Sequence, residues 1–205
     1  MDLQYFTGDI EIDGEIMVEK LKDAHLQTGT DRKKQYQQYW GKYPSSKMIS
    51  ATWGYTKRGK MSVDKWREES DLYGYYQTQV MTNNPELRDV FQEYAMLHLP
   101  KTFHWTQVQI NYNWAIPPHR DASNQGRSYI VGLGDYKNGR LVVNINGKNK
   151  SVNIRNNVFG FDGSKHTHWV TPFYGDRWSL VFFTHHGKNE LRKLRKKKKI
   201  EEENN

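Results

Sequence analysis

The stretch HTHWVTPFYGDRWSLVFF, residues 166–183, decides the fold class of this chain of 205 residues. It contains two short runs rich in β-branched and aromatic residues, THWV and RWSLVFF, separated by the turn-forming residues Pro172, Gly175 and Asp176. Similar runs begin near Phe103: WTQVQINYNW, SYIVGLG, RLVVNIN, KSVNI and NVFGF. Short strands separated by turns at this spacing predict a β-sandwich or a barrel.

Helices are expected before the strand-rich region. Residues 15–27 place apolar side chains near helical spacing and predict a short amphipathic helix. A second helix is predicted to start at Asn84, with Pro85 at its first helical position, and to end at Pro100. The periodicity of the sequence assigns nothing between these two helices. In the strand-rich half, INGKNKSVNI predicts a hairpin that turns at residues 146–147.

The net charge of +8 is concentrated in two places. Residues 188–205 hold eight Lys and Arg against four Glu, a charge run that predicts a disordered tail or a frayed helix. Residues 32–67 hold ten Lys and Arg against Asp64 alone, with seven Tyr and Trp side chains interleaved. Such cations can contact phosphates and such rings can stack on bases, which favours DNA as a partner. The alternative is a solvated surface whose aromatic side chains turn toward the core.

Length and composition bound the remaining possibilities. We expect one domain over residues 1–187, followed by the charged tail. The chain has no cysteine, so a metal must be held by His, Asp or Glu. There is no run of about 18 apolar residues and no signal or transit peptide pattern. We therefore expect a soluble, intracellular monomer without a membrane partner, located in the nucleus or in a virus- or phage-infected cell if its source is eukaryotic or viral, and otherwise in the cytoplasm.

His119 and Asp121 are candidate metal ligands. On an extended strand, positions two apart point to the same face, so both side chains could bind one ion. Two His and one carboxylate on one face of an octahedron form the site of non-haem iron(II) oxygenases, which leaves three coordination positions free. His168 is the favoured third ligand. His166 shares its face and is the competing choice, and Asp162 is expected to belong to a turn.

Arg177 follows His168 by nine residues, after a Val and a Pro, and Ser179 follows at the next same-face position. This pattern resembles the distal half of the motif of 2-oxoglutarate-dependent oxygenases. The planar guanidinium can bind the far carboxylate of 2-oxoglutarate through two hydrogen bonds, and the Ser179 hydroxyl can add another. Asn111 is a further candidate for this co-substrate, as are Tyr112 and Asn113 beside it.

The segment HRDASNQGRSYIVGLG, residues 119–134, resembles the corresponding segment of the TET/JBP oxygenases, which hydroxylate the methyl group of 5-methylcytosine or thymine in nucleic acid. The proximal residues that match that family's pattern are His119, Asp121, Asn124, Gly126 and Ser128. The distal matches are Phe183 and His185. The resemblance covers roughly residues 105–187 and leaves out the Cys-rich zinc region of the animal TET proteins.

The resemblance implies iron(II), 2-oxoglutarate and O₂ as cofactor and co-substrates, with ascorbate as a reductant. It also implies a base flipped out of the DNA helix, which would lie on the ring of Phe183 while Asn124 and His185 bind its polar edge. A flipped base needs an aromatic ring to stack on and polar groups that bind its Watson–Crick edge. These three side chains supply both.

Together these features predict an α+β, mainly β protein. Its core over residues 101–187 would be a double-stranded β-helix (jelly-roll, cupin-like), with the helical and basic region of residues 1–100 packed on it. The predicted activity is hydroxylation of 5-methylcytosine in DNA to 5-hydroxymethylcytosine or beyond. Two alternatives stay open: an oxygenase acting on thymine, RNA, protein or a small molecule, and a basic nucleic-acid-binding module without catalysis.

Overall fold

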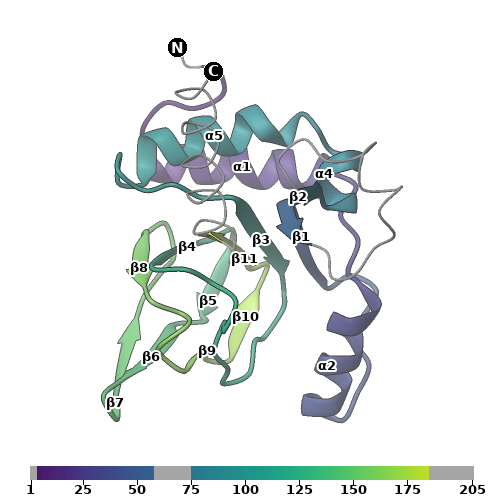
Figure 1. The fold of residues 1–205 in the computed structure, drawn as a ribbon, viewed down its shortest axis with the longest axis vertical. Helices are drawn as coiled ribbons and strands as arrows, with labels where there is room; N and C mark the ends of the chain where they lie inside the picture. The colour runs from purple at the N-terminus through teal and green to yellow at the C-terminus, as the bar shows by residue number, and fades with distance from the viewer. Residues whose placement is uncertain (1–3, 58–74, 185–205) are drawn as a thin grey trace, which may run out of the picture.

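The structure, a computed structural model, describes residues 4–57 and 75–184. The helices are α1 (Ile10–Asp23), α2 (Thr30–Trp40), α4 (Gln79–Asn83) and α5 (Leu87–His98). The strands are β1 (Ile49–Lys57), β2 (Tyr75–Gln77), β3 (Gln107–Tyr112), β4 (Ser128–Leu133), β5 (Tyr136–Asn138), β6 (Leu141–Ile145), β7 (Lys148–Val152), β8 (Phe159–Phe161), β9 (His168–Val170), β10 (Phe173–Gly175) and β11 (Trp178–Phe183). Figure 1 shows the strands beneath the adjacent helices α1 and α5, with α2 standing apart at one side.

The largest sheet has the strand order β2-β1-β3-β11-β4-β8, and all its neighbouring strands are antiparallel. The last described strand, β11, lies in the middle of this sheet. Ser179 of β11 pairs with Asn111 of β3 on one side and with Gly132 of β4 on the other. The sheet is therefore assembled from segments that are far apart in the sequence.

Two smaller antiparallel sheets, β7-β6-β9 and β10-β5, complete the fold. Ile130 and Val181 of the large sheet pack against Leu141 and Val143 of the three-stranded sheet, so an apolar core lies between the two sheets. Sheets that face each other in this way form a jelly roll. The structure confirms the predicted α+β, mainly β fold with a jelly-roll core.

The strands of the large sheet have two different faces. In β3, Val108 and Ile110 lie on the face that packs against α1 and α5 in the main apolar core. The alternate residues of β3 are polar and lie on the opposite face. β11 repeats this division with Leu180 and Phe182 on the helix side. The helices therefore cover one face of the sheet and leave a partly polar inner face for a site.

Buried carboxylates fasten the N-terminal segment to the helices. Glu93 of α5 accepts hydrogen bonds of 2.8–3.1 Å from the backbone N–H groups of residues 4–6. Asp13 of α1 accepts from Thr7 and Gly8 and lies 2.8 Å from Nε2 of His98. Burial raises the pKa of both carboxyl groups, but the hydrogen bonds outweigh it, so both pKa values are lowered.

The helix α2 is attached to the rest of the fold through aromatic side chains. The Tyr36 ring lies 4.8 Å from the Trp114 ring, centroid to centroid, and the indole N–H of Trp40 donates to the carbonyl of Ala115. Tyr36 is the only residue of α2 that is buried. The other side chains of this helix are available to a cavity or to solvent.

The predicted helices exist with different bounds. The first begins at Ile10, because Asp9 caps the N–H groups of Glu11 and Ile12, and it ends at Asp23, where Ala24 turns extended. The second starts at Leu87, because Pro85 belongs to the preceding turn. The stretch that the sequence left unassigned contains α2, β1, β2 and α4, and it adds β1 and β2 to the large sheet. The region before residue 100 is therefore not only helical.

The predicted hairpin is confirmed. β6 and β7 pair across Asn146 and Gly147, whose positive φ values of 51° and 81° are those of a type I′ turn. The charged tail and much of the basic stretch, residues 58–67, lie outside the described residues. None of the helices in the described part of the chain combines the length and apolarity needed to cross a bilayer.

Candidate functional site

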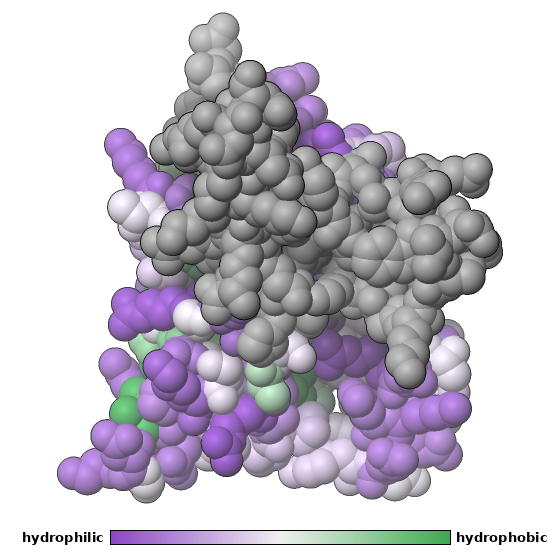
Figure 2. All heavy atoms as spheres, viewed as in Figure 1, coloured by the Kyte–Doolittle hydropathy of each residue, from purple (hydrophilic) through white to green (hydrophobic). Residues whose placement is uncertain are grey.

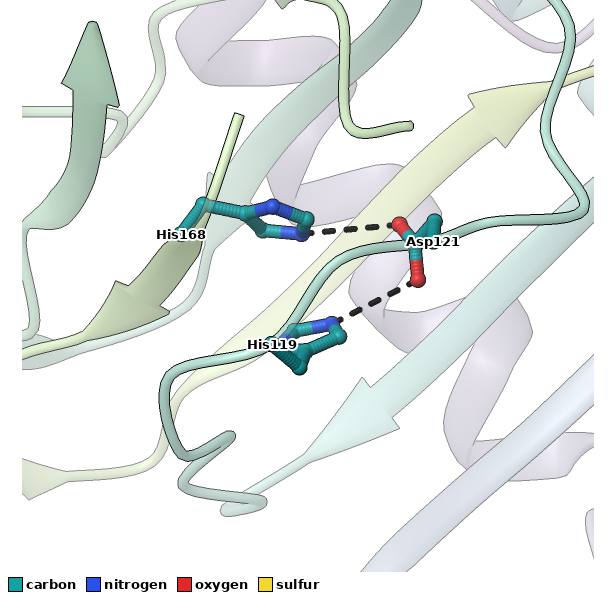
Figure 3. Close-up of side chains that lie close together, drawn as sticks. All are labelled: His119, Asp121 and His168. Carbon is teal, nitrogen blue, oxygen red and sulfur yellow. Dashed lines mark ion pairs between the residues drawn. The ribbon is translucent and has the colours of Figure 1, made fainter. Parts of the chain in front are cut away.

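His119, Asp121 and His168 converge on one point. Their ligand atoms all lie within 4.8 Å of one another, and each imidazole Nε2 lies 3.4 Å from a different oxygen of Asp121 (Figure 3). The backbones of His119 and His168 exchange two hydrogen bonds of 2.9 and 3.1 Å, which brings the two rings together. His119 and Asp121 lie in a loop and not on the expected strand, and a third backbone bond, from Asp121 N–H to Gly163, holds the loop.

The proton positions on both imidazoles are set by backbone carbonyls. Nδ1 of His119 lies 2.8 Å from the carbonyl oxygen of Pro117, and Nδ1 of His168 lies 2.9 Å from that of His166. A carbonyl can only accept, so each Nδ1 carries the hydrogen and each Nε2 presents a lone pair toward Asp121. Two lone pairs and a carboxylate then face one another, an arrangement that fits a bound cation.

The charge state of Asp121 suits the same purpose. Burial alone would raise the pKa of this carboxyl, but the neighbouring imidazoles of His119 and His168 lower the pKa well below its usual range. Asp121 is therefore ionised at neutral pH. Two imidazole nitrogens and one carboxylate oxygen form a donor set typical of iron(II), with no thiolate in the chain to favour a softer metal.

The competing ligands stay outside this cluster. His166 contributes its backbone carbonyl to orient His168, and its ring is not among the three convergent groups. Asp162 accepts hydrogen bonds from Ser164 and from the backbone of Lys165, which makes it the turn residue that was expected. The geometry thus favours His168 over both alternatives.

A cavity of about 890 Å³ opens beside the three convergent residues. It lies between the inner face of the large sheet, the loop that carries Asp121, and α2. The predicted site residues that line it are His119, Asp121, His168, Asn111, Asn124, Ser179 and Phe183. Its size is that of pockets that hold a drug-sized ligand.

Arg177 is buried without a hydrogen-bonding partner. It is 1% exposed, and no guanidinium nitrogen has a partner among the described residues. The guanidinium carbon lies 5.4 Å from the Tyr136 ring centroid and 5.3 Å from that of Phe173. Burial lowers the pKa of Arg177, although an arginine stays charged at neutral pH. A buried cation without an anion is unfavourable, so this site fits an anionic ligand.

Tyr136 completes this anion site, and the sequence did not single it out. Its hydroxyl is buried without a partner among the described residues. Burial raises the pKa of Tyr136, so the hydroxyl stays protonated and can donate. Arg177 lies two residues before Ser179 in the sequence, and the Tyr136 hydroxyl lies against Gly132, the β4 partner of Ser179, where a Cβ would be 2.1 Å from it. Gly139 leaves room for Arg177, because a Cβ there would lie 2.9 Å from Nε of Arg177.

The other co-substrate candidates fall into two groups. Asn111 lies next to Ser179, and its Nδ2 is 3.4 Å from the Ser179 hydroxyl. Tyr112 lies on the opposite face of β3, where it donates to Asp176 and packs against Trp178. The side chain of Asn113 accepts from the backbone N–H of Arg177, so it shapes the turn before that residue. Neither Tyr112 nor Asn113 lines the cavity.

The substrate candidates Asn124 and Phe183 both line the cavity. Nδ2 of Asn124 lies 3.4 Å from both Asp121 Oδ2 and Ser128 Oγ, so its amide hydrogens point to protein atoms. Phe183 is 8% exposed and lies at the end of β11. His185 lies outside the described residues.

No protein-family model and no curated protein sequence matches this chain. Among solved structures, the chain is similar to NgTET1 in a complex with 5mC DNA, with a TM-score of 0.48, 14% identity, and 82% of this chain and 77% of that chain covered. It is similar to a 2OG-Fe(II) oxygenase family oxidoreductase from Burkholderia pseudomallei, with a TM-score of 0.44, 17% identity, and 77% and 79% covered. A prolyl-4-hydroxylase from Pseudomonas putida gives a TM-score of 0.45, 10% identity, and 90% of both chains covered. The solved structures that resemble this chain thus include 2OG-Fe(II) oxygenases.

Proposed function

We propose that this chain is an iron(II)- and 2-oxoglutarate-dependent dioxygenase that hydroxylates the methyl group of 5-methylcytosine in DNA. The observation that carries the proposal is that one structure contains both a set of metal-binding side chains and a buried, unpaired arginine. His119, Asp121 and His168 converge as a donor set that fits a metal ion. Arg177 is a buried cation without an anion. A metal ion chelated by a dicarboxylic acid would fit both groups, because the metal would bind the two imidazoles and the carboxylate of Asp121 while the free carboxylate of the acid would pair with Arg177.

The chain's own residues have distinct roles in this proposal. His119, Asp121 and His168 hold one face of the metal and leave the other coordination positions to ligands. Arg177 and Tyr136 bind the far carboxylate of 2-oxoglutarate, and Ser179, oriented by Asn111, adds a hydroxyl beside them. When bound, iron(II) and 2-oxoglutarate supply O₂ activation, with one oxygen atom going to the methyl group and the other to succinate, and with CO₂ released.

In this proposal, apolar side chains of the cavity limit the access of bulk water to the reacting group. The wall of the cavity above the metal residues includes the apolar side chains of Ile130, Leu141, Phe161 and Val181. An apolar wall limits side reactions and strengthens the electrostatic interactions inside the site. Phe161 also packs edge-on against the His168 ring at 4.7 Å, which fixes the orientation of that ligand.

Support for DNA as the substrate comes from α2. This helix lines the cavity with Arg32, Gln35, Tyr36 and Tyr39, and it carries further cations on its exposed side. Tyr39 and Trp40 are 53% and 42% exposed. Figure 2 shows the α2 side of the molecule as mainly hydrophilic. Cations for phosphates and exposed rings for stacking, beside a cavity large enough for a base, suit a nucleic acid from which one base is flipped.

The test is mass spectrometry of nucleosides from 5-methylcytosine DNA incubated with the protein, iron(II), 2-oxoglutarate and ascorbate. The control is the His119→Ala/Asp121→Ala double variant. A 5-hydroxymethylcytosine peak that the control lacks is the expected result. Succinate without a modified cytosine would move the substrate to thymine, RNA, protein or a small molecule. If neither product forms, the proposed activity is wrong.

A further inference from the structure

Three amide side chains lie in a row on the inner face of β3: Gln107, Gln109 and Asn111 all line the cavity. Two of the three are occupied by neighbouring protein atoms. The Gln109 amide accepts from the Thr52 hydroxyl at 2.7 Å and donates to Asn111 Oδ1 at 3.1 Å. The Ser50 hydroxyl donates to Asn111 Oδ1 at 3.0 Å. These two amides therefore build the floor of the cavity.

Gln107 is different. It is 3% exposed, yet its side chain makes no hydrogen bond with any residue that the structure describes. A buried primary amide carries two donor hydrogens and one acceptor oxygen, and leaving them unpaired is unfavourable. Buried polar groups in proteins nearly always have a partner. The Gln107 amide is not among the fully enclosed side-chain atoms without a partner, and Gln107 lines the cavity, so its polar atoms are open to the cavity and available to a ligand there.

The surroundings of Gln107 fit a flat ligand. Its cross-strand neighbour on β11 is Phe183, and its neighbour on β1 is Gly54. Gly54 has a φ of +122°, and a Cβ there would lie 2.4 Å from the carbonyl oxygen of Thr106. Position 54 thus requires glycine, because the backbone of Thr106 and Gln107 packs directly against it. An aromatic ring and a free amide stand side by side.

This corner of the cavity is connected to the metal residues. The loop that carries Asp121 and Asn124 continues to Gln125, whose backbone N–H donates to the carbonyl of Thr184 at 2.8 Å. Thr184 directly follows Phe183, and Phe183 pairs with Gln107. A ring that lies on Phe183 therefore has the metal loop along one edge and can have Gln107 along another.

We infer that Gln107 binds the polar edge of a planar, ring-shaped substrate and so positions the reacting methyl group. The inference rests on the proposed function, in which the ring is a pyrimidine base. An amide oxygen accepts from the exocyclic amine of cytosine while the amide hydrogen is donated to the ring nitrogen, and the flipped amide suits thymine equally well. Asn124 cannot replace it as a donor, because its amide hydrogens point to Asp121 and Ser128.

The test compares Gln107→Leu, which keeps the shape and loses the hydrogen bonds, with Gln37→Leu at an exposed position of α2 outside the cavity lining. Binding is measured with two single-stranded oligonucleotides that differ only in carrying one 5-methylcytosine or an abasic site. We expect the base to strengthen binding to the unmodified protein. Gln107→Leu should reduce that gain and raise KM for the methylated strand by about 10- to 100-fold.

The variant must leave other properties of the protein intact. The affinity for 2-oxoglutarate and the thermal midpoint of Gln107→Leu should match those of Gln37→Leu, because the Gln107 amide has no partner in the described protein. Gln107→Glu, which keeps the shape and loses the donor, should show a similar rise in KM. A large loss of stability in Gln107→Leu would reveal a structural role and overturn the inference.

The outcomes separate this inference from the function on which it rests. If methylated DNA stimulates succinate formation by the unmodified protein and Gln107→Leu has the same KM, the inference alone is overturned. If no oligonucleotide stimulates succinate formation, the proposed substrate is wrong and the role of Gln107 in binding a base is overturned with it.

Discussion

Replacing Arg177 by methionine should change stability in opposite directions in the free and the ligand-bound protein. The guanidinium is 1% exposed and has no hydrogen-bonding partner among the described residues. The free protein therefore bears the desolvation of an unpaired cation, while a bound carboxylate would offset it. We expect Arg177→Met to stabilise the free protein and to remove the stabilisation that 2-oxoglutarate provides.

The magnitude follows from the surroundings of Arg177. Desolvation of a buried ion costs several kcal/mol even after relaxation. The rings of Tyr136 and Phe173, at 5.4 and 5.3 Å, return up to about 2 kcal/mol each. Methionine retains the apolar stem, so the net gain for the free variant is about 1 kcal/mol, or roughly 2–4 °C in Tm for a chain of this size. Ligand at a hundred times its Kd should add about 2.7 kcal/mol to the unmodified protein and nothing to the variant.

The assay is urea denaturation with and without 2-oxoglutarate, in the presence of nickel(II) as a redox-inert substitute for iron. Arg155→Met is the matched control, because Arg155 contacts the same Tyr136 ring, at 5.8 Å, with a side chain that is 43% exposed. It should keep the full effect of the ligand. A free Arg177→Met protein that is less stable by more than about 1 kcal/mol, or one that 2-oxoglutarate still stabilises fully, would refute the assignment of an anion site.

Three further changes test other parts of the structure. Gly139→Ala should weaken 2-oxoglutarate binding and lower the free energy of unfolding by about 1–3 kcal/mol. The new Cβ would contact the Arg177 side chain, and the backbone φ of +62° at position 139 is strained for alanine. Gly147→Ala, at φ +81° in open space, should show only the backbone strain, and equal ligand affinities in the two variants would contradict this. Glu93→Gln should lose about 1–3 kcal/mol at pH 7. The pKa of Glu93 is lowered on folding, so its contribution is present above about pH 4 and lost as the pH falls further, and urea midpoints should converge there. Lys34→Glu should weaken DNA binding and flatten its dependence on salt, as measured by anisotropy, whereas an unchanged slope would remove α2 from the DNA interface.

The sequence was most informative where local pattern and structure coincide. The β11 stretch could be predicted because one of its faces is apolar and packs with the helices. The spacing of His119, Asp121 and His168 identified residues that the structure brings together, although the convergence comes from backbone pairing with β9 and not from a shared strand. That pairing is between segments nearly fifty residues apart, which no local pattern reports.

The elements that the sequence missed have polar inner faces. β1 alternates Ser50, Thr52 and Gly54 with the apolar Ile49, Ala51 and Trp53, so a strand pattern was present in the sequence but was left unassigned. α2 buries only Tyr36 and thus lacks the apolar stripe by which an amphipathic helix is recognised. Tyr136 and Gln107 stand out because their side chains have no hydrogen-bonding partner in the described part of the chain, and this becomes visible only when their neighbours in space are known.

The central place of β11 bears on how the protein is made. During synthesis β3 and β4 emerge from the ribosome before β11, which lies between them in the sheet. Until β11 is made, each of the two strands has an unpaired edge. Exposed edges of this kind invite pairing with other chains, and pairings between distant segments form slowly. Arg177 and Ser179 arrive with β11, and the anion site can form only after translation has passed this strand. A nascent chain thus forms this site only after β3, β4 and the strands that follow them have been made.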